Sequence, residues 1–373
     1  MTRIFLTSLL LFHLFLVPSK AAEGLHNPQL PFRFPFPFGF PGRVEEPPQE
    51  YEQDKTDDKQ TNQLNPNLRE GFYSDTCPNA EKIVADVLAN TIKKNPNAVA
   101  NLIRLQFHDC FVVGCDASVL LDYSRDGGDQ VEKSSMFNGL LLKGADLIDE
   151  IKTKLEEQCP QTVSCADTLA FATNEAMTLA GLPPRKPLGG RRDGLDSRAT
   201  VAEDNNLPLP NWSMDQMLEL FNKKGFNAEE MVVLLGAHSV GYAHCDVFVE
   251  RLNNFQKSGK PDPELPGPVI NELKGECKDP GTPQYRNPPV SFDETPTLLD
   301  NLFFKNLVER KKSLLITDSH LIADLRTTPI VQQMAADAEL FRKRFAEVMV
   351  KLSSLNVLTG NDGEVRKICR SSN

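Results

Sequence analysis

The sequence predicts a mostly α-helical domain that is braced by disulfides and preceded by a leader and a non-globular extension. Three observations carry this prediction. Apolar residues recur with helical periodicity over most of the chain beyond residue 69, strand signals are short and weak, and all eight cysteines lie beyond the leader. A chain of 373 residues is long enough for one large domain, and no internal repeat divides it.

Residues 1–22 have the features of a secretory signal peptide. A positive start precedes an apolar run over residues 4–17, and small residues follow, so cleavage is expected near Ala21 or Ala22. The apolar run is too short for a membrane span, and no later segment approaches one, so we expect no membrane partner. We therefore expect an exported protein.

The charge of the exported protein excludes one class of partner. Loss of the leader removes two basic residues and no acidic ones, so the formal net charge falls from −10 to −12. This acidity argues against nucleic acid and against charge-driven adhesion to anionic polymers.

Residues 23–69 do not have the composition of a folded domain. Phenylalanine alternates with proline over residues 30–41, and an acidic, glutamine-rich stretch follows. Proline at this density excludes a helix or a central strand, which leaves polyproline II or disorder. We favour a disordered linker, and the alternative is an aromatic tail in which residues 30–41 contact the cell wall.

Residues 70–373 have a globular texture, and helices are expected in chain order. Their expected bounds are 80–94, 97–108, 144–157, 164–180, 213–224, 228–236, a helical turn within 239–253, 301–311 and 329–354.

The helix expected at 97–108 carries the first chemical signal. Arg104 and His108 are four residues apart, so their side chains leave the same face of the helix. The neighbours Val99, Leu102 and Leu105 indicate that this helix is mostly buried. A cation and an imidazole directed together into an apolar interior indicate general acid–base chemistry beside developing negative charge.

The eight cysteines of this exported chain predict four disulfides. Eight cysteines permit 105 pairings, so spacing alone leaves most of the connectivity open. Cys110 and Cys115 are close enough to pair locally. The alternative is a zinc site formed by His108, Cys110 and Cys115, although exported thiols usually oxidise.

A second histidine, His238, follows directly on an apolar segment that ends at Gly236. Alone, such a histidine is more often a core residue than a ligand. Together with Arg104 and His108 it favours a metal ligand, because haem peroxide chemistry requires one histidine for proton transfer and another to hold the iron.

The ordered motifs FYSDTCPNAE, RLQFHDCFVVGCDASVLLD, CPQTVSCADTLA, GGRRDG, LLGAHSVGYAHC, TPTLLDN and VLTGNDGEVRKIC resemble those of class III (plant secretory) haem peroxidases. The resemblance covers about residues 71–370. Because the chain ends four residues after Cys369 without the long C-terminal extension of vacuolar members, we expect a secreted protein of the apoplast or cell wall. It implies the haem peroxidase fold, with haem b held between a distal and a proximal helical part. It further implies a monomer that reduces hydrogen peroxide to water while it oxidises small phenolic donors one electron at a time.

The same resemblance assigns roles around the haem. His238 would be the axial iron ligand, and Asp318 would accept its ring N–H and make the imidazole more basic. His108 would take a proton from peroxide and return it to the departing oxygen. Arg104 would stabilise charge as the O–O bond breaks, and Phe107 would limit access.

Two further residues complete the implied site. Asn138 should accept the other ring N–H of His108, which sets the tautomer and lowers the pKa. Pro208 would line the exposed haem edge where aromatic donors dock.

The resemblance also implies two calcium sites, four disulfides and one buried ion pair. The distal calcium ligands would be Asp109, Asp116, Ser118 and the carbonyls of Val112 and Gly114, with Glu132 acting through water. The proximal ligands would be Ser239, Asp293, Thr295, the Leu298 carbonyl and Asp300. The implied disulfides are Cys77–Cys159, Cys110–Cys115, Cys165–Cys369 and Cys245–Cys277, and the ion pair is Asp167–Arg191.

Two departures from the family pattern qualify these expectations. Glu294 is the only residue between Asp293 and Thr295 where two are usual, so we expect Asp293 to reach the proximal calcium poorly. Residues 140–145 read LLLKGA in place of the usual Asn-Ser-Leu-Arg-Gly-Phe, so Ala145 stands where a phenylalanine is usual. Because this change comes just after Asn138, it qualifies the expected hydrogen bond between Asn138 and His108 and leaves the role of His108 itself unaffected.

Two rival functions belong to other classes. One is a low-turnover protein on a peroxidase scaffold that acts in binding or in wall structure through its Phe/Pro-rich extension. The other is a calcium- or zinc-binding module without haem. The intact set of Arg104, His108, His238 and Asp318 favours the enzyme.

Overall fold

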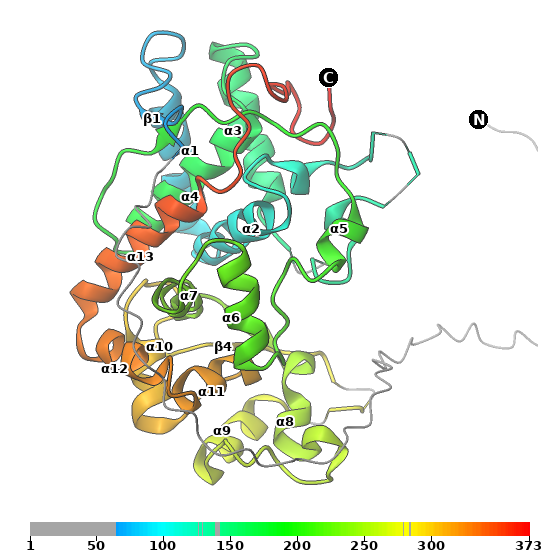
Figure 1. Cartoon of the computed structure of the whole chain (residues 1–373), viewed down its shortest axis with the longest axis vertical. Coiled ribbons are helices and arrows are strands. Elements are labelled where there is room, and N and C mark those ends of the chain that lie inside the picture. The colour runs from blue at the N-terminus through cyan, green and yellow to red at the C-terminus, as the bar shows by residue number, and fades with distance from the viewer. Residues whose placement is uncertain (1–64, 126, 129, 139–141, 279, 283–284) are drawn as a thin grey trace, which may run out of the picture. The chain divides into compact units, whose positions relative to one another are not determined.

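Helices form most of the structure, a computed structural model that describes residues 65–373 apart from 126, 129, 139–141, 279 and 283–284 (Figure 1). The expected leader and the Phe/Pro-rich segment lie outside the described residues. The described residues belong to the unit Lys59–Asn373. None of the helices among them combines the length and the apolar character needed to cross a bilayer.

The first group of helices surrounds α4, which packs against α1, α2 and α3 (Figure 1). Its members are α1 (Ala80–Lys94), α2 (Ala98–Val112), α3 (Ala145–Gln158), α4 (Cys165–Leu179) and the short α5 (Ala199–Glu203). Ser164 precedes α4 with extended backbone, and its side chain accepts the N–H of Asp167, which satisfies one free donor of the first turn.

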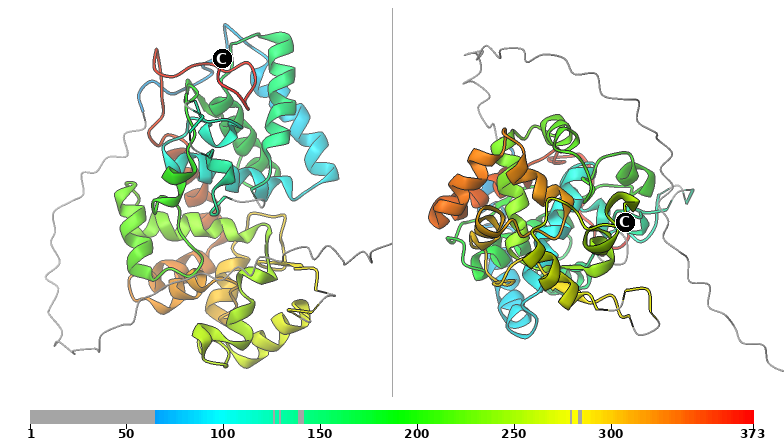
Figure 2. Two further views of the ribbon diagram at one scale, coloured as in Figure 1. Left: turned by 90° about the vertical axis from the view of Figure 1, so that its right-hand side faces the viewer. Right: turned by 90° about the horizontal axis from the view of Figure 1, so that it is seen from below.

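The second group contains the remaining helices, and the left view of Figure 2 shows most of it below the first group. Its members are α6 (Met214–Lys223), α7 (Ala228–Leu235), α8 (Val249–Asn253), α9 (Gly267–Glu276), α10 (Leu302–Lys305), α11 (Ile316–Ala323), α12 (Thr328–Ala336) and α13 (Ala338–Leu352). Capping boxes begin α6 at Ser213 and α7 at Asn227. A four-residue 3₁₀ turn, Gly236–Ser239, continues directly from α7.

Strands are short, as expected. β1 (Arg69–Glu70) pairs antiparallel with β2 (Leu188–Gly189), and β3 (Tyr242–His244) pairs antiparallel with β4 (Pro289–Ser291). Leu68 is buried and Arg69 pairs with Gly189, so these two residues join the fold, although composition places them in the extension.

Several expected bounds differ from the structure. The expected helical turn within 239–253 is wrong over its first half, where the Gly241 N–H bonds to Pro296 and the chain runs into β3. The expected helix 329–354 is interrupted at Asp337, whose extended backbone ends α12 and whose carboxylate caps α13. Helix α2, which carries Arg104 and His108, continues past the expected end at His108 to Val112. The sequence interpretation missed α9 and α11.

Three of the four disulfides connect elements that are distant in the sequence, and the fourth, Cys110–Cys115, is local. The four bonds are Cys77–Cys159, Cys110–Cys115, Cys165–Cys369 and Cys245–Cys277, which are the pairs that the resemblance implies. One large core cluster includes residues of both helical groups, and a smaller one surrounds Cys245 and Cys277. The disulfide Cys110–Cys115 rules out the alternative zinc site, because a disulfide sulfur is no thiolate ligand.

Candidate functional site

Helix α2 brings Arg104 and His108 together. The two side chains are one helical turn apart, and Arg104 Nε donates to His108 Nε2 at 3.3 Å. A nitrogen that accepts a hydrogen bond carries no proton, so Nε2 of His108 presents its lone pair on this side.

Asn138 holds the opposite edge of the same ring. His108 Nδ1 lies 2.5 Å from Asn138 Oδ1, and because an amide oxygen only accepts, we assign the ring proton to Nδ1. Asn138 itself is buried, and its Nδ2 donates to the carbonyl of Glu132 at 2.6 Å. Glu132, which the resemblance places beside the distal calcium, therefore positions Asn138, and Asn138 in turn orients His108.

Burial, together with the nearby charge of Arg104, lowers the pKa of His108 to about 3. The hydrogen bond to Asn138 acts in the opposite direction and raises the pKa. The expectation that Asn138 lowers this pKa is therefore wrong, because an acceptor for the ring N–H stabilises the protonated ring as well. Burial also lowers the pKa of Arg104 from its ordinary value.

Phe107 lies near the His108 ring, whereas Pro208 has no described contact with that ring. The Phe107 ring stacks on Phe111 with centroids 4.2 Å apart, and its centroid lies 6.1 Å from that of the His108 ring. Pro208 is half-buried in the loop between α5 and α6. Among the described contacts, none connects Pro208 to Phe107 or His108.

His238 lies on the 3₁₀ turn that follows α7. Its Nδ1 is 2.9 Å from Asp318 Oδ1, and Asp318 on α11 is fully buried. Phe292 stacks parallel to the imidazole with ring centroids 4.3 Å apart, and Phe303 meets it edge-on at 5.8 Å. These contacts fix the plane of the ring.

Glycine is required at position 236, directly before this turn. A Cβ at Gly236 would lie 2.5 Å from Phe341 Cε2 and 2.9 Å from Phe304 Cε2. Only glycine lets the backbone that carries His238 approach these two aromatic rings so closely.

The donor set at His238 fits the expected haem. Asp318 engages Nδ1, while Nε2 has no hydrogen-bond partner among the described residues and keeps the lone pair that haem iron requires. The side chain is 25% exposed, although core aromatics pack around its ring. His238 therefore suits the role of an iron ligand, because the Asp318 carboxylate orients the ring through Nδ1 and leaves Nε2 for the metal.

The expected distal calcium ligands meet in the segment that follows α2. Asp109 Oδ2 accepts the N–H of Ala117 at 3.1 Å, and Asp116 Oδ1 accepts the N–H of Ser118 at 2.9 Å. Asp109 Oδ1 and Ser118 Oγ are buried and make no hydrogen bond within the described part of the chain. Both carboxylate oxygens of Glu132 are likewise buried and make no hydrogen bond there.

Crowding of these acids supports a cation at this position. Burial, together with Asp116 and Glu132, raises the pKa of Asp109 well above its ordinary value, and burial raises the pKa of Glu132 to about 8. No group of three or more histidine, cysteine or acidic side chains in the described residues surrounds a single metal position. A calcium ion would therefore depend on carbonyl and hydroxyl oxygens as well, which is usual for this hard cation.

One contact to this segment was missed by the sequence interpretation. Lys224, at the end of α6, donates from Nζ to the carbonyl of Val112 at 3.1 Å. The two residues are 112 positions apart, and no motif connects them.

The expected proximal calcium ligands also lie together. Ser239 Oγ donates to the Leu298 carbonyl at 2.9 Å and accepts the N–H of Asp300 at 3.0 Å. Thr295 Oγ1 donates to Asp300 Oδ2 at 2.9 Å, and its N–H donates to Asp293 Oδ1 at 2.8 Å. Asp293 thus stays beside the other four residues in spite of the shortened spacing.

The side chain of Glu294 does not join the expected calcium ligands and binds other residues. Lys312, Arg310 and Asn306 all donate to its carboxylate. Burial raises its pKa, but the hydrogen bonds of Lys312 and Asn306 outweigh burial and lower the pKa to about 2.

The expected buried ion pair between Asp167 and Arg191 is also present, with Arg191 Nη1 at 2.8 Å from Asp167 Oδ1 and both side chains buried.

Comparison with known proteins gives a consistent result. The family model described as "Peroxidase" matches residues 84–337. Peroxidase 28 of Arabidopsis thaliana is 44% identical over 306 residues, which cover 82% of this chain and 93% of that protein. Peroxidase 57 of the same plant is 39% identical over 307 residues, and Peroxidase 44 is 41% identical over 309 residues, with the same shares covered.

Proposed function

Because this chain belongs to the plant class III peroxidases, which are hydrogen-peroxide-dependent oxidoreductases and typically secretory, we propose that it is an apoplastic or wall enzyme that oxidises small phenols. Each turnover converts one hydrogen peroxide and two phenols to two waters and two phenoxyl radicals. Haem b, which membership of the family implies, supplies when bound the iron that exchanges electrons with peroxide and donor.

The observation that carries the proposed mechanism is the pair of hydrogen bonds at His108. Asn138 accepts a hydrogen bond from Nδ1–H, so Nε2 carries the lone pair that can take a proton from peroxide and return it to the departing oxygen. The low pKa of His108 keeps the ring neutral and ready to act as a base at any pH well above about 3. Arg104, at 3.3 Å from the same nitrogen, stabilises the negative charge that develops as the O–O bond breaks.

His238 and Asp318 form the other half of the proposed site. His238 would hold the haem iron through Nε2. Asp318 accepts a hydrogen bond from His238 Nδ1–H, which makes the imidazole a stronger electron donor to a metal. Phe107 narrows the approach to the distal side, and Pro208 borders the edge at which a phenol docks.

Two calcium ions are part of the proposal. The distal ion neutralises the crowded carboxylates near Glu132 and so stabilises the loop that positions Asn138. The proximal ion binds among Ser239, Thr295 and Asp300, beside the turn that carries His238.

The proposed domain organisation is a leader at residues 1–22, an extension that ends before Leu68 and a catalytic domain from Leu68 to Asn373, because Leu68 is buried and Arg69 pairs with Gly189. The extension acts as a linker, and we propose that catalysis does not depend on it. The domain acts as a monomer.

The proposal is tested by reconstitution of the mature chain with haem and calcium. We expect a Soret band and peroxide-dependent oxidation of guaiacol. His108→Leu should retain the haem and slow the reaction with peroxide by roughly 10²- to 10⁴-fold, the usual contribution of a positioned general base. Haem binding without turnover in the wild-type chain would instead favour the scaffold function.

A further inference from the structure

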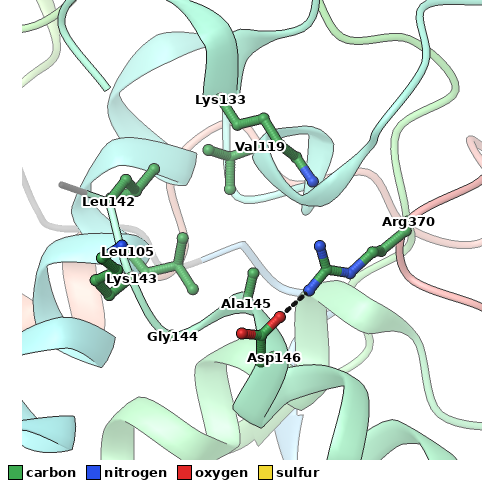
Figure 3. Close-up of a pocket in the computed structure, with 9 residues that line it drawn as sticks. All are labelled: Leu105, Val119, Lys133, Leu142, Lys143, Gly144, Ala145, Asp146 and Arg370. Atoms are coloured by element: carbon green, nitrogen blue, oxygen red, sulfur yellow. Dashed lines mark hydrogen bonds and ion pairs between the residues drawn. The ribbon is translucent and has the colours of Figure 1, made fainter. Parts of the chain in front are cut away.

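A pocket opens at the first turn of α3, and none of Arg104, His108 or His238 lines it. Its cavity volume is ≈ 190 Å³. Figure 3 shows its wall, which combines segments from α2, from the loop after it, from the start of α3 and from the C-terminal end of the chain. The site described above therefore does not account for it.

The inner wall of the pocket is apolar. Leu105, Val119 and Leu142 provide aliphatic surface, and Ala145 contributes a single methyl group. The preceding Gly144 lies so close to α2 that a Cβ there would be 3.3 Å from Leu105 Cδ2. The small residues at 144 and 145 leave open the space that the usual phenylalanine at position 145 would enter.

The size of this space limits the occupant. An apolar cavity of about 150 Å³ holds a benzene ring. The pocket is somewhat larger, at ≈ 190 Å³, so it accepts one aromatic ring and a small polar group.

The rim of the pocket is cationic. Lys133, Lys143 and Arg370 line it, against one acid, Asp146. Asp146 pairs with Arg370, but its side chain is 99% exposed and its charge is screened by water (Figure 3). The side chains of Lys133 and Arg370 are 24% and 31% exposed, but those of Asp122 and Asp149, which pair with them, are about equally buried at 36% and 32% exposed and balance part of their charge.

The partners of these cations differ. Lys133 and Arg370 both approach Asp122 Oδ1, at 2.6 and 3.9 Å, and Arg370 also binds Asp149. Lys143 has no ion pair among the described residues, so its ammonium group is available to a ligand. In addition, no side chain caps the N-terminus of α3, whose dipole favours an anion at this end.

We propose that this pocket binds a small aromatic monocarboxylate. The ring lies against Leu105, Val119 and Leu142, and the carboxylate faces Lys143 and Lys133. The ligand class follows from one ring-sized apolar space with a cationic rim. Since neither histidine borders the pocket, binding is independent of the proposed reaction.

Benzoate is a suitable probe because it has the ring and the carboxylate but no phenol to oxidise. Calorimetric titration into the purified full chain should give one site per protein, with the same affinity in the presence of saturating cyanide. Benzamide, which keeps the ring without the charge, should bind at least about threefold more weakly, which is the scale of a partly exposed ion pair.

Three variants test the location. Ala145→Phe should fill the space and abolish benzoate binding. Lys143→Gln should weaken benzoate about threefold and leave benzamide unchanged. Lys154→Gln, an exposed lysine on the same helix outside the pocket, is the matched control and should bind as the wild type does.

Unchanged benzoate affinity in a folded Ala145→Phe variant would overturn the proposal. Equal affinity for benzoate and benzamide in the wild type would overturn it as well, and this comparison does not depend on the folding of any variant. Loss of benzoate binding on addition of cyanide would place the ligand at the haem instead.

Discussion

Asn138 and His108 are 30 residues apart in the sequence and 2.5 Å apart in the structure, amide oxygen to ring nitrogen. The bond assigns the ring proton to Nδ1, and therefore assigns the lone pair that acts on peroxide to Nε2. Proton transfer at this site depends on a residue outside the helix that carries the base.

Replacement of Asn138 by alanine should slow the reaction with peroxide about 10²-fold, because the imidazole loses the acceptor that fixes its tautomer. Stopped-flow absorbance of the reconstituted enzyme measures this step directly. The conservative variant Asn138→Gln tests positioning, since it keeps the amide and moves its oxygen. An Asn138→Ala rate within a factor of two of the wild type would contradict the assigned tautomer.

Replacement of Asp318 by asparagine should raise the reduction potential of the bound haem. The amide accepts the His238 N–H more weakly than a carboxylate does, so the imidazole donates less to the iron and the oxidised state is less favoured. Spectroelectrochemical titration gives the potential without reference to turnover. Asp324→Asn, on an acid just beyond α11, is the control and should leave the potential unchanged.

Replacement of Gly236 by alanine should destabilise the protein by about 1–3 kcal/mol, because the added Cβ overlaps Phe341 and Phe304. Thermal unfolding measures the loss. Gly275→Ala in α9 is the matched control, since its Cβ meets nothing within 4 Å and alanine is the better helix former. Equal stability of the two variants would show that the aromatic rings move aside at no cost.

Calcium should stabilise the protein more at pH 8 than at pH 5. In the metal-free protein, burial raises the pKa of Glu132 to about 8, above its usual value of 4.5. The folded state therefore binds the proton more tightly, and the stability that this group contributes is lost as pH rises from about 4.5 to about 8. Calcium binds the ionised cluster and reverses that loss.

Thermal unfolding of resin-treated protein, with and without added calcium, tests this dependence at the two pH values. Glu132→Gln should reduce the difference between them, because the neutral amide does not titrate. A calcium effect that is the same at pH 5 and pH 8 would contradict a calcium site at these carboxylates.

Truncations should separate the extension from the fold. Removal of residues 23–64 should leave the melting temperature and the activity unchanged. Removal of residues 23–70 also deletes buried Leu68 and the strand that pairs with Leu188–Gly189, and should lower the melting temperature. Activity lost with the shorter deletion would mean that the extension takes part in function.

Local patterns accounted for most of what the sequence predicted correctly. The helix Ala80–Lys94 was expected with the same bounds, because periodicity and the following Asn-Pro are signals within a few residues. The interruption at Asp337 was not expected, because continuous apolar periodicity over 329–354 concealed a side-chain cap. The strand Tyr242–His244 was missed for a different reason, since it is stabilised by pairing with Pro289–Ser291, whose residues are 45 to 49 positions further along the chain.

The sequence by itself determined the chemical groups of this protein. Arg104 and His108 share a face because a helix repeats every few residues, and the ordered motifs around them identify the family. Tertiary structure alone decided how these groups are oriented. Asn138 reaches His108, Asp318 reaches His238 over 80 residues, and Lys224 reaches Val112 over 112, because chain folding and close packing bring together groups that no local pattern relates.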